Sequence, residues 1–120
     1  TIVTWGAMVH VALEASSEAS KKGIEVEVID LRTLVPLDAR TCIESVRRTG
    51  KLLILQESQW TGGFGHTVSS RIIEESFWIL ECPPVVIGAL DTPVPFSPTL
   101  EDHTIPSVEL VSRHIEVACA

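Results

Sequence analysis

The chain has 120 residues, 45% apolar and 21% charged, so it is long enough for one domain and too apolar for a disordered segment. Sixteen acidic and nine basic residues give a net charge of −7, which argues against nucleic acid and anionic membrane surfaces as partners. The mean hydropathy is high at +0.29, yet no apolar run approaches the roughly 20 residues of a membrane-spanning helix. We therefore expect a single domain over residues 1–120 with a well-covered core, a partner interface, or both.

The first thirty residues change from a strand pattern to a helix pattern and back. Residues 2–5 are short, apolar and partly β-branched, which predicts a strand. A helix is predicted from Gly6 to Lys22, ended by Gly23, with one face of small residues that can lie close to a sheet. That face consists of Met8, Ala12, Ala15 and Ala19. Residues 24–30 predict a second strand, half-exposed at its start and buried at its end.

The middle of the chain repeats this alternation. Asp38 is expected to cap a helix over residues 39–49, and Gly50 is expected to end it. Residues 51–55 consist of a lysine and a continuous run of four apolar residues, which is typical of a strand covered on both faces. Residues 56–65 are polar and rich in glycine, so they are predicted to form a loop.

The last part of the chain completes the pattern. A helix is predicted over residues 66–80, and a short buried strand over 85–87. The segment 91–106 contains four prolines and is predicted to have no regular structure. Ser107 is expected to cap a final helix. This alternation predicts an α/β fold, a three-layer α/β/α arrangement with a mostly parallel sheet of four to five strands.

Three cysteines, Cys42, Cys82 and Cys119, form no C-x-x-C pair. An odd number of cysteines and the lack of a signal-like start favour reduced thiols in the bacterial cytoplasm or the mitochondrial matrix. Cys42 and Cys82 are expected to be small buried residues rather than reactive thiols. Because the chain opens directly in a strand-like sequence, we expect it to be a fragment of a longer protein.

Polar residues beyond the carboxyl ends of the strands are the candidate site, because ligands of open α/β sheets bind there. These residues are Arg32, Glu57, Gln59, Trp60, His66 and Asp91. Gly62 and Gly63 precede a predicted helix N-terminus, where free amide groups could face an anion. No P-loop or dinucleotide-binding motif is present, so the favoured interpretation is a turn that passes close to neighbouring backbone.

Catalytic chemistry has little support in the sequence. Glu57 and His66 flank the loop and could form an acid–base pair, but no Ser or Cys nucleophile lies in a recognisable motif. The four histidines are scattered without metal-ligand spacing. We therefore assign no catalytic, cofactor-binding or metal-binding residue. Trp5 and Trp78 are expected in the core or an interface. The loop or interface candidates are Glu57, Trp60, Gly62, Gly63 and His66.

Acidic residues are concentrated near the end of the chain. The thirty residues from Asp91 onward carry five acids and one base, whereas the first ninety carry eleven acids and eight bases.

Three stretches of sequence resemble one family. The three stretches are Asp30-Leu-Arg-Thr-Leu-Val-Pro-Leu-Asp38, then Thr49-Gly-Lys-Leu-Leu-Ile-Leu-Gln-Glu57 with Thr61-Gly-Gly-Phe-Gly65, and then Asp91-Thr-Pro-Val-Pro-Phe96 with Leu100-Glu-Asp-His103 and Ile105-Pro-Ser107. With Thr1-Ile-Val-Thr-Trp-Gly6, they resemble the C-terminal domain of the beta subunit of thiamine-dependent 2-oxo acid dehydrogenases (pyruvate, branched-chain 2-oxo acid or acetoin type).

The resemblance covers nearly the whole chain. The third stretch favours this subunit over the related C-terminal domains of transketolase and deoxyxylulose-phosphate synthase, which remain the alternative. At His66-Thr67 the family usually has a small residue followed by an acidic one, so a contact made by that carboxylate is in doubt here. An alternative from another class is a stand-alone α/β module that binds an anion at the Gly62-Gly63 loop.

The resemblance implies a five-stranded mixed sheet whose antiparallel edge strand would lie before Thr1. It implies that thiamine diphosphate, magnesium and the catalytic histidines of the whole enzyme lie outside this chain, between the alpha subunit and the N-terminal half of the beta subunit. The whole enzyme would decarboxylate a 2-oxo acid and acylate lipoamide. This domain would contact the alpha subunit and a second beta subunit, and would dock the basic subunit-binding domain of the acyltransferase core. We expect Asp91, Glu101 and Asp102 to be the docking carboxylates.

Overall fold

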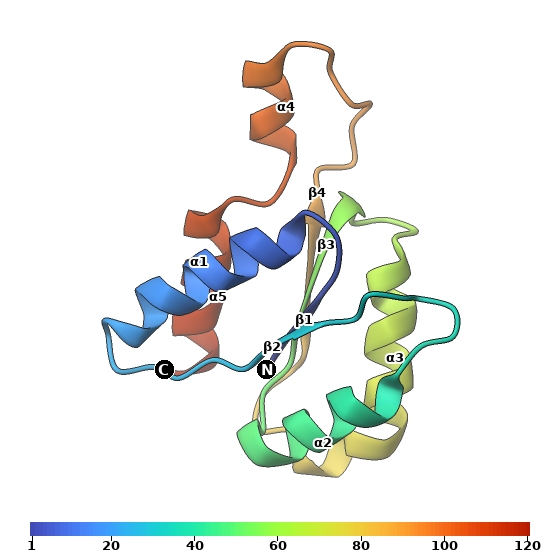
Figure 1. Cartoon of the computed structure of the whole chain (residues 1–120), viewed down its shortest axis with the longest axis vertical. Helices are drawn as coiled ribbons and strands as arrows, with labels where there is room; N and C mark the ends of the chain where they lie inside the picture. The colour runs from blue at the N-terminus through green and yellow to red at the C-terminus, as the bar shows by residue number, and fades with distance from the viewer.

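The computed structural model describes all 120 residues and shows strands alternating with helices, with an arm that extends beyond the sheet (Figure 1). The elements are β1 (Ile2–Thr4), α1 (Met8–Ser20), β2 (Val28–Asp30), α2 (Ala39–Thr49), β3 (Leu53–Gln59), α3 (Phe64–Ser76), the 3₁₀ turn η1 (Phe77–Ile79), β4 (Val85–Ala89), α4 (Pro98–Thr104) and α5 (Val108–Ala118). None of these helices combines the length and the apolar character that crossing a membrane requires.

The four strands form one parallel sheet in the spatial order β2-β1-β3-β4. The two interior strands are β1 and β3, and Val3 of β1 lies opposite Ile29 of β2 on one side and Ile54 of β3 on the other. All of β1 and the first four residues of β3 are buried, as expected for strands with helices on both faces. The predicted α/β fold with a parallel sheet is confirmed.

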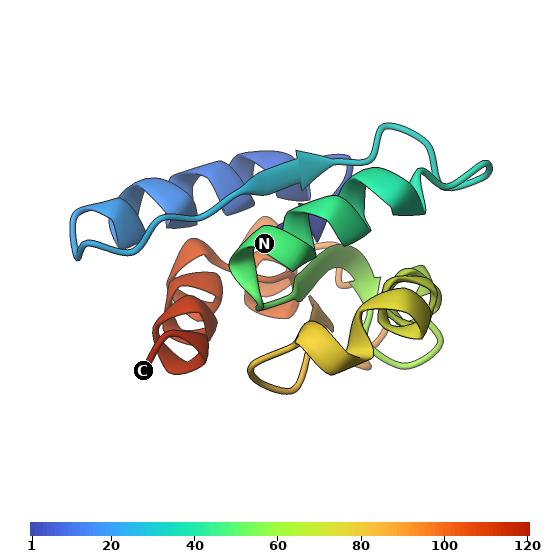
Figure 2. The same ribbon diagram turned by 90° about the horizontal axis from the view of Figure 1, so that it is seen from below.

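Helices cover both faces of the sheet, which gives the three predicted layers (Figures 1 and 2). On one face α1 lies beside α5 and buries the predicted small-residue face, Met8, Ala12, Ala15 and Ala19. On the other face lie α2 and α3. Cys42 of α2 is fully buried there, and burial raises the pKa of its thiol to about 11. This thiol therefore stays protonated at neutral pH, as expected for a packing residue.

The ends of α2 follow directly from the sequence. The Asp38 carboxylate accepts a hydrogen bond from the N–H of Thr41 at 3.1 Å, which satisfies a free donor in the first turn. Gly50 ends the helix with φ +71°, and its N–H donates to the carbonyl of Val46 at 2.7 Å. Both predicted ends of this helix are confirmed.

Other boundaries differ from the prediction. The second strand covers only Val28–Asp30, because β2 is an edge strand whose earlier residues share a single backbone hydrogen bond with β1, from Ile2 N–H to Glu27 C=O. The third helix ends at Ser76, where the 3₁₀ turn η1 changes the helical period. Trp78 lies on this turn and is 92% exposed, so of the two predicted positions the core is wrong and the interface stays a prediction.

The proline-rich segment contains a helix, so the prediction that it lacks regular structure is wrong. α4 begins with Pro98 at a first-turn position, where a missing N–H and a fixed φ are tolerated. None of its seven residues is buried. Together with the preceding loop, α4 forms a projecting arm, which we define as residues 91–104 (Figure 1). The N–H of Leu90 donates to the carbonyl of Thr104 at 2.9 Å and closes the base of this arm.

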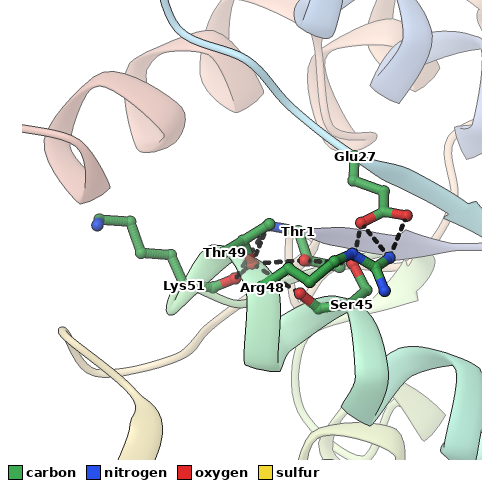
Figure 3. A network of polar contacts seen from close by, with 6 residues as sticks. All are labelled: Thr1, Glu27, Ser45, Arg48, Thr49 and Lys51. Carbon is green, nitrogen blue, oxygen red and sulfur yellow. Dashed lines mark hydrogen bonds and ion pairs between the residues drawn. The ribbon is translucent and has the colours of Figure 1, made fainter.

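At the opposite end of the sheet, a polar network joins Thr1, α2 and the extended segment before β2 (Figure 3). The Ser45 hydroxyl lies 2.6 Å from both the Thr1 hydroxyl and the Glu27 carboxylate. Glu27 also pairs with the Arg48 guanidinium at 2.7 Å. The hydrogen bonds from Ser45 and Arg48 lower the pKa of Glu27 below its ordinary value. The network holds α2 at the amino end of the sheet. The candidate site lies at the other end, beyond the carboxyl ends of the strands.

Candidate functional site

Strand β3 carries a bulge where it leaves the core. Leu55 pairs with Ile87 of β4, but the next pair is Gln59 with Ala89, so β3 has more residues than β4 between the two pairs. Gln56, the first residue of the bulge, is fully buried. The bulge therefore places one polar side chain at the end of an apolar core.

The buried Gln56 amide holds the glycine-rich loop against the sheet. Its Nε2 donates to the carbonyl of Gln59 at 2.9 Å, and its Oε1 accepts from the N–H of Gly65 at 2.6 Å. A Cβ atom would lie 1.9 Å from this Nε2 if it were added at Gly63, and 2.9 Å if it were added at Gly88. Glycine is required at Gly63 because the Gln56 amide occupies the space of a side chain.

This packing supports the turn interpretation of the Gly62-Gly63 loop over the anion-binding one. Gly62 has φ +73°, and Gly63 immediately precedes α3. Near the N-terminus of α3, the N–H of Gly65 already donates to Gln56, which removes one amide that an anion would need. The loop therefore passes close to neighbouring backbone, as the favoured interpretation predicts.

Trp60 and His66 lie together at the edge of the loop, and Glu57 lies apart from them. The Trp60 indole N–H donates to the carbonyl of Val86 at 3.0 Å, and its ring meets the His66 ring edge-on at 4.6 Å. His66 Nε2 lies 2.8 Å from the Trp60 carbonyl, which can only accept, so the ring nitrogen is the donor. Glu57 is exposed, and its carboxylate makes no hydrogen bond or ion pair. The structure therefore does not form the acid–base pair of Glu57 and His66.

Asp91 joins the base of the arm to the glycine-rich loop. Its carboxylate accepts from the Thr61 hydroxyl at 2.6 Å and from the Thr61 N–H at 2.9 Å. Gln59 adds a weaker link through Nε2 to the carbonyl of Thr92 at 3.3 Å. The two hydrogen bonds from Thr61 lower the pKa of Asp91 below its ordinary value. Asp91 therefore has a structural role, in addition to the docking role that the sequence predicts.

We expect Asp91→Asn to reduce stability at neutral pH and to have less effect in acid. A carboxylate whose pKa is lowered by folding stabilises the folded state above its unfolded pKa of about 3.9 and loses that contribution as pH falls further. Urea unfolding of the wild type and the variant at about pH 7 and about pH 3 measures the difference. Asp102→Asn, which removes an exposed carboxylate without a hydrogen bond, is the control. If the difference in free energy of unfolding between the wild type and Asp91→Asn is as large at about pH 3 as at about pH 7, the prediction is wrong.

The other two predicted docking carboxylates, Glu101 and Asp102, are exposed on α4 and take part in no ion pair. Glu101 lines a groove of about 290 Å³ between β3 and the arm, and Glu57 lines its other side. The structure thus brings Glu101 and Glu57 to one groove. Arg32 is at a separate position beside β2, where it pairs with Asp30 at 2.6 Å.

Sequence reasoning missed Gln56 and Thr61, the residues that hold the site together. Gln56 directly follows a four-residue apolar run, Leu52 to Leu55, and precedes a glycine-rich stretch, which is the signal that could have identified a buried amide. Thr61 carries no such signal, because its partner Asp91 is 30 residues away in the sequence. No three His, Cys, Asp or Glu side chains come together in a way that could hold a metal ion.

Comparisons with known proteins agree on one family. Residues 1–111 match the family model described as "Transketolase, C-terminal domain". The chain is 44% identical over 112 residues to the beta subunit of the acetoin:2,6-dichlorophenolindophenol oxidoreductase of Cupriavidus necator, covering 93% of this chain and 33% of that protein. It is 39% identical over 119 residues to a mitochondrial pyruvate dehydrogenase E1 component subunit beta-2 of Oryza sativa, covering 99% of this chain and 32% of that protein.

A solved structure has the same fold. It is described as a split gene transketolase in an inactive beta4 tetramer, and it superposes with a TM-score of 0.74 at 29% sequence identity. The match covers 98% of this chain and 37% of that one. The chain therefore spans about a third of the length of the relatives that it matches.

Proposed function

Because the chain belongs to the transketolase C-terminal domain family, we propose that it is the assembly and docking domain of the beta subunit of a thiamine diphosphate-dependent 2-oxo acid dehydrogenase. The similarity to beta subunits of an acetoin oxidoreductase and a pyruvate dehydrogenase supports this choice. The split gene transketolase has the same fold at lower identity, so it supports the domain type more than the enzyme type. In this proposal the chain is one domain of a longer subunit.

The proposed whole enzyme decarboxylates a 2-oxo acid on thiamine diphosphate and passes the acyl group to lipoamide. This domain contributes assembly rather than chemistry. Its side chains form no cluster for magnesium, and the amide groups of its glycine loop are partly used by Gln56, so the residues present do not fit the cofactor. We accordingly assign no catalytic step to them. The proposed partners in the enzyme are an alpha subunit and a second beta subunit, in the bacterial cytoplasm or the mitochondrial matrix.

The observation that carries the docking role is the acidic arm. α4 projects from the sheet (Figure 1). It buries none of its residues, and its Glu101 and Asp102 are exposed and have no ion-pair partner. Asp91 anchors the base of the arm. Unpaired carboxylates on a projecting segment attract a basic partner and orient it. The family resemblance implies a basic subunit-binding domain on the acyltransferase core, and we propose that it docks on this arm.

The test is a titration of the chain with that subunit-binding domain at about 0.05 M and about 0.5 M salt, a range over which charge screening increases strongly. The variant combines Asp91→Asn, Glu101→Gln and Asp102→Asn. We expect binding at low salt to weaken at least about tenfold, and its dependence on salt to decrease. A control, Glu14→Gln with Glu25→Gln and Glu18→Gln, removes as many exposed carboxylates elsewhere. Binding that ignores salt, or that the arm variant and the control affect equally, contradicts the proposal.

A further inference from the structure

The first part of the arm, which we call the proline segment, is held extended by its own sequence. It covers residues 92–98 and contains three prolines, whose φ is fixed at about −65°. The residue before each proline is restricted to extended or polyproline II conformations, and Ser97 has φ −73° and ψ 127°. Residues 93–96 take part in no backbone–backbone hydrogen bond. The sequence thus favours an exposed polyproline II segment that loses little conformational entropy on binding.

A second exposed apolar surface follows α3. The turn η1 buries none of its three residues, Phe77, Trp78 and Ile79. The rings of Phe77 and Trp78 meet edge-on at 5.0 Å and line a groove of about 490 Å³. We call this groove the aromatic corner, and its other apolar residues are Leu80, Pro83 and Pro84. Grooves lined by aromatic side chains bind proline-rich segments in the polyproline II conformation. The chemistry of the corner therefore fits the proline segment.

The arm of the same chain cannot reach the aromatic corner. The arm projects at one end of the molecule and η1 lies at the other end, along a longest dimension of 42 Å (Figure 1). The hydrogen bond from Leu90 to Thr104 closes the base of the arm and keeps it beyond β4. A proline segment in the corner must therefore belong to another molecule.

The charges beside the two surfaces are complementary. Arg47 of α2 shares a pocket with Glu75, which precedes Phe77 by two residues, so this guanidinium lies beside the aromatic corner. It is the one Lys or Arg side chain of the chain without an ion pair. Glu101 and Asp102 lie on α4, directly after the proline segment, and are also unpaired. An arm in the corner can therefore bring unpaired carboxylates toward an unpaired cation.

We propose that the aromatic corner binds the proline segment of a second copy of this chain, with Trp78 packed on the prolines. The two surfaces lie at opposite ends of the molecule, so the contact is head-to-tail and its repetition builds a ring or a filament. Because a seven-residue segment buries little area, the contact is weak and depends on concentration. This inference goes beyond the proposed docking function and does not rest on it, since no acyltransferase takes part.

Sedimentation velocity of the chain alone, from about 10 µM to about 1 mM, tests this contact. We expect the mass of the wild type to rise above the monomer value of 13.1 kDa as the concentration rises. Trp78→Ala should weaken self-association at least about tenfold, and so should Pro93→Ala combined with Pro95→Ala. Leu13→Ala shortens an exposed apolar side chain on α1 and should behave as the wild type. Thermal unfolding checks that each variant is folded.

A mixture of the two defective variants distinguishes a head-to-tail contact from any other. Trp78→Ala keeps its proline segment and the proline variant keeps its corner, so the mixture restores one contact. We expect a one-to-one complex with twice the monomer mass of 13.1 kDa, which does not grow further. The inference is wrong if the wild type stays monomeric up to about 1 mM, if both variants associate as the wild type does, or if the mixture forms no complex. None of these outcomes affects the acyltransferase titration, which tests docking separately.

Discussion

Gly63→Ala should destabilise the chain by about 2 to 3 kcal/mol, as expected for overpacking at a site that cannot move. The added methyl group would lie 1.9 Å from Gln56 Nε2 and 2.6 Å from the backbone carbonyl of Gln59. The Gln56 amide is fully buried, so it has no solvent-exposed space into which it can turn. Gly63 has φ −71°, so the cost arises from the contact and not from the backbone conformation. Chemical unfolding at neutral pH measures the loss.

Two further variants separate the causes of this loss. Gly23→Ala adds a methyl group where nothing lies within 4 Å but where φ is +77°, so it measures the conformational cost alone, about 1 kcal/mol. Gln56→Ala in the Gly63→Ala background removes the closer of the two contacts and leaves the contact with Gln59. We expect this double variant to lose less free energy of unfolding than the sum of the losses of the two single variants. If Gly63→Ala costs no more than Gly23→Ala, the loop is not held by Gln56 in the way described.

Phe96→Ala should weaken binding of the subunit-binding domain at least about 30-fold while leaving the free energy of unfolding nearly unchanged. Phe96 lies on the arm and is fully exposed, so its removal creates no cavity in the chain. Buried aromatic side chains at the centre of an interface commonly contribute 2 kcal/mol or more, which corresponds to this change in Kd. Carboxylates such as Glu101 mainly set the association rate, so the effect of Phe96→Ala should appear in the dissociation rate.

Leu13→Ala, which shortens another exposed apolar residue on α1, is the control for Phe96→Ala. Surface plasmon resonance gives both rate constants, and thermal unfolding gives stability. The corner formed by Phe77 and Trp78 is the competing surface, because their rings meet edge-on at 5.0 Å and Trp78 is exposed. If Trp78→Ala weakens binding and Phe96→Ala does not, the docking surface lies at that corner and not on the arm.

Local signals in the sequence predicted those parts of the fold that depend on neighbouring residues. Asp38 and Gly50 mark both ends of α2, because capping and a left-handed helix end act within a few positions. The alanine face of α1 and its position on the sheet follow from helical periodicity. The bulge in β3 could not be predicted in this way, because it depends on how Gln56 packs against glycines from a different strand and from the loop.

The candidate site was predicted in its residue types and only partly in its arrangement. The sequence placed Glu57, Trp60, His66 and Asp91 at the carboxyl end of the sheet, but it did not show which of them touch. Asp91 bonds to Thr61 and Trp60 packs on His66, whereas Glu57 remains free. The docking roles of Asp91, Glu101 and Asp102 stay predictions. The density of prolines in the arm concealed α4, since Pro98 at the first turn is compatible with a helix.

The hydrogen bond between Leu90 and Thr104 makes the arm a replaceable module. Its two ends meet at one point beyond β4, so residues between Thr92 and Thr104 can be exchanged without losing the hydrogen bonds of Asp91 with Thr61 and of Thr92 with Gln59. The entropic cost of a longer loop grows only slowly with its length. On the proposed docking role of the arm, partner choice can therefore change separately from folding stability, through changes confined to a few exposed residues. A graft of this segment between two family members tests whether the arm determines the choice of partner.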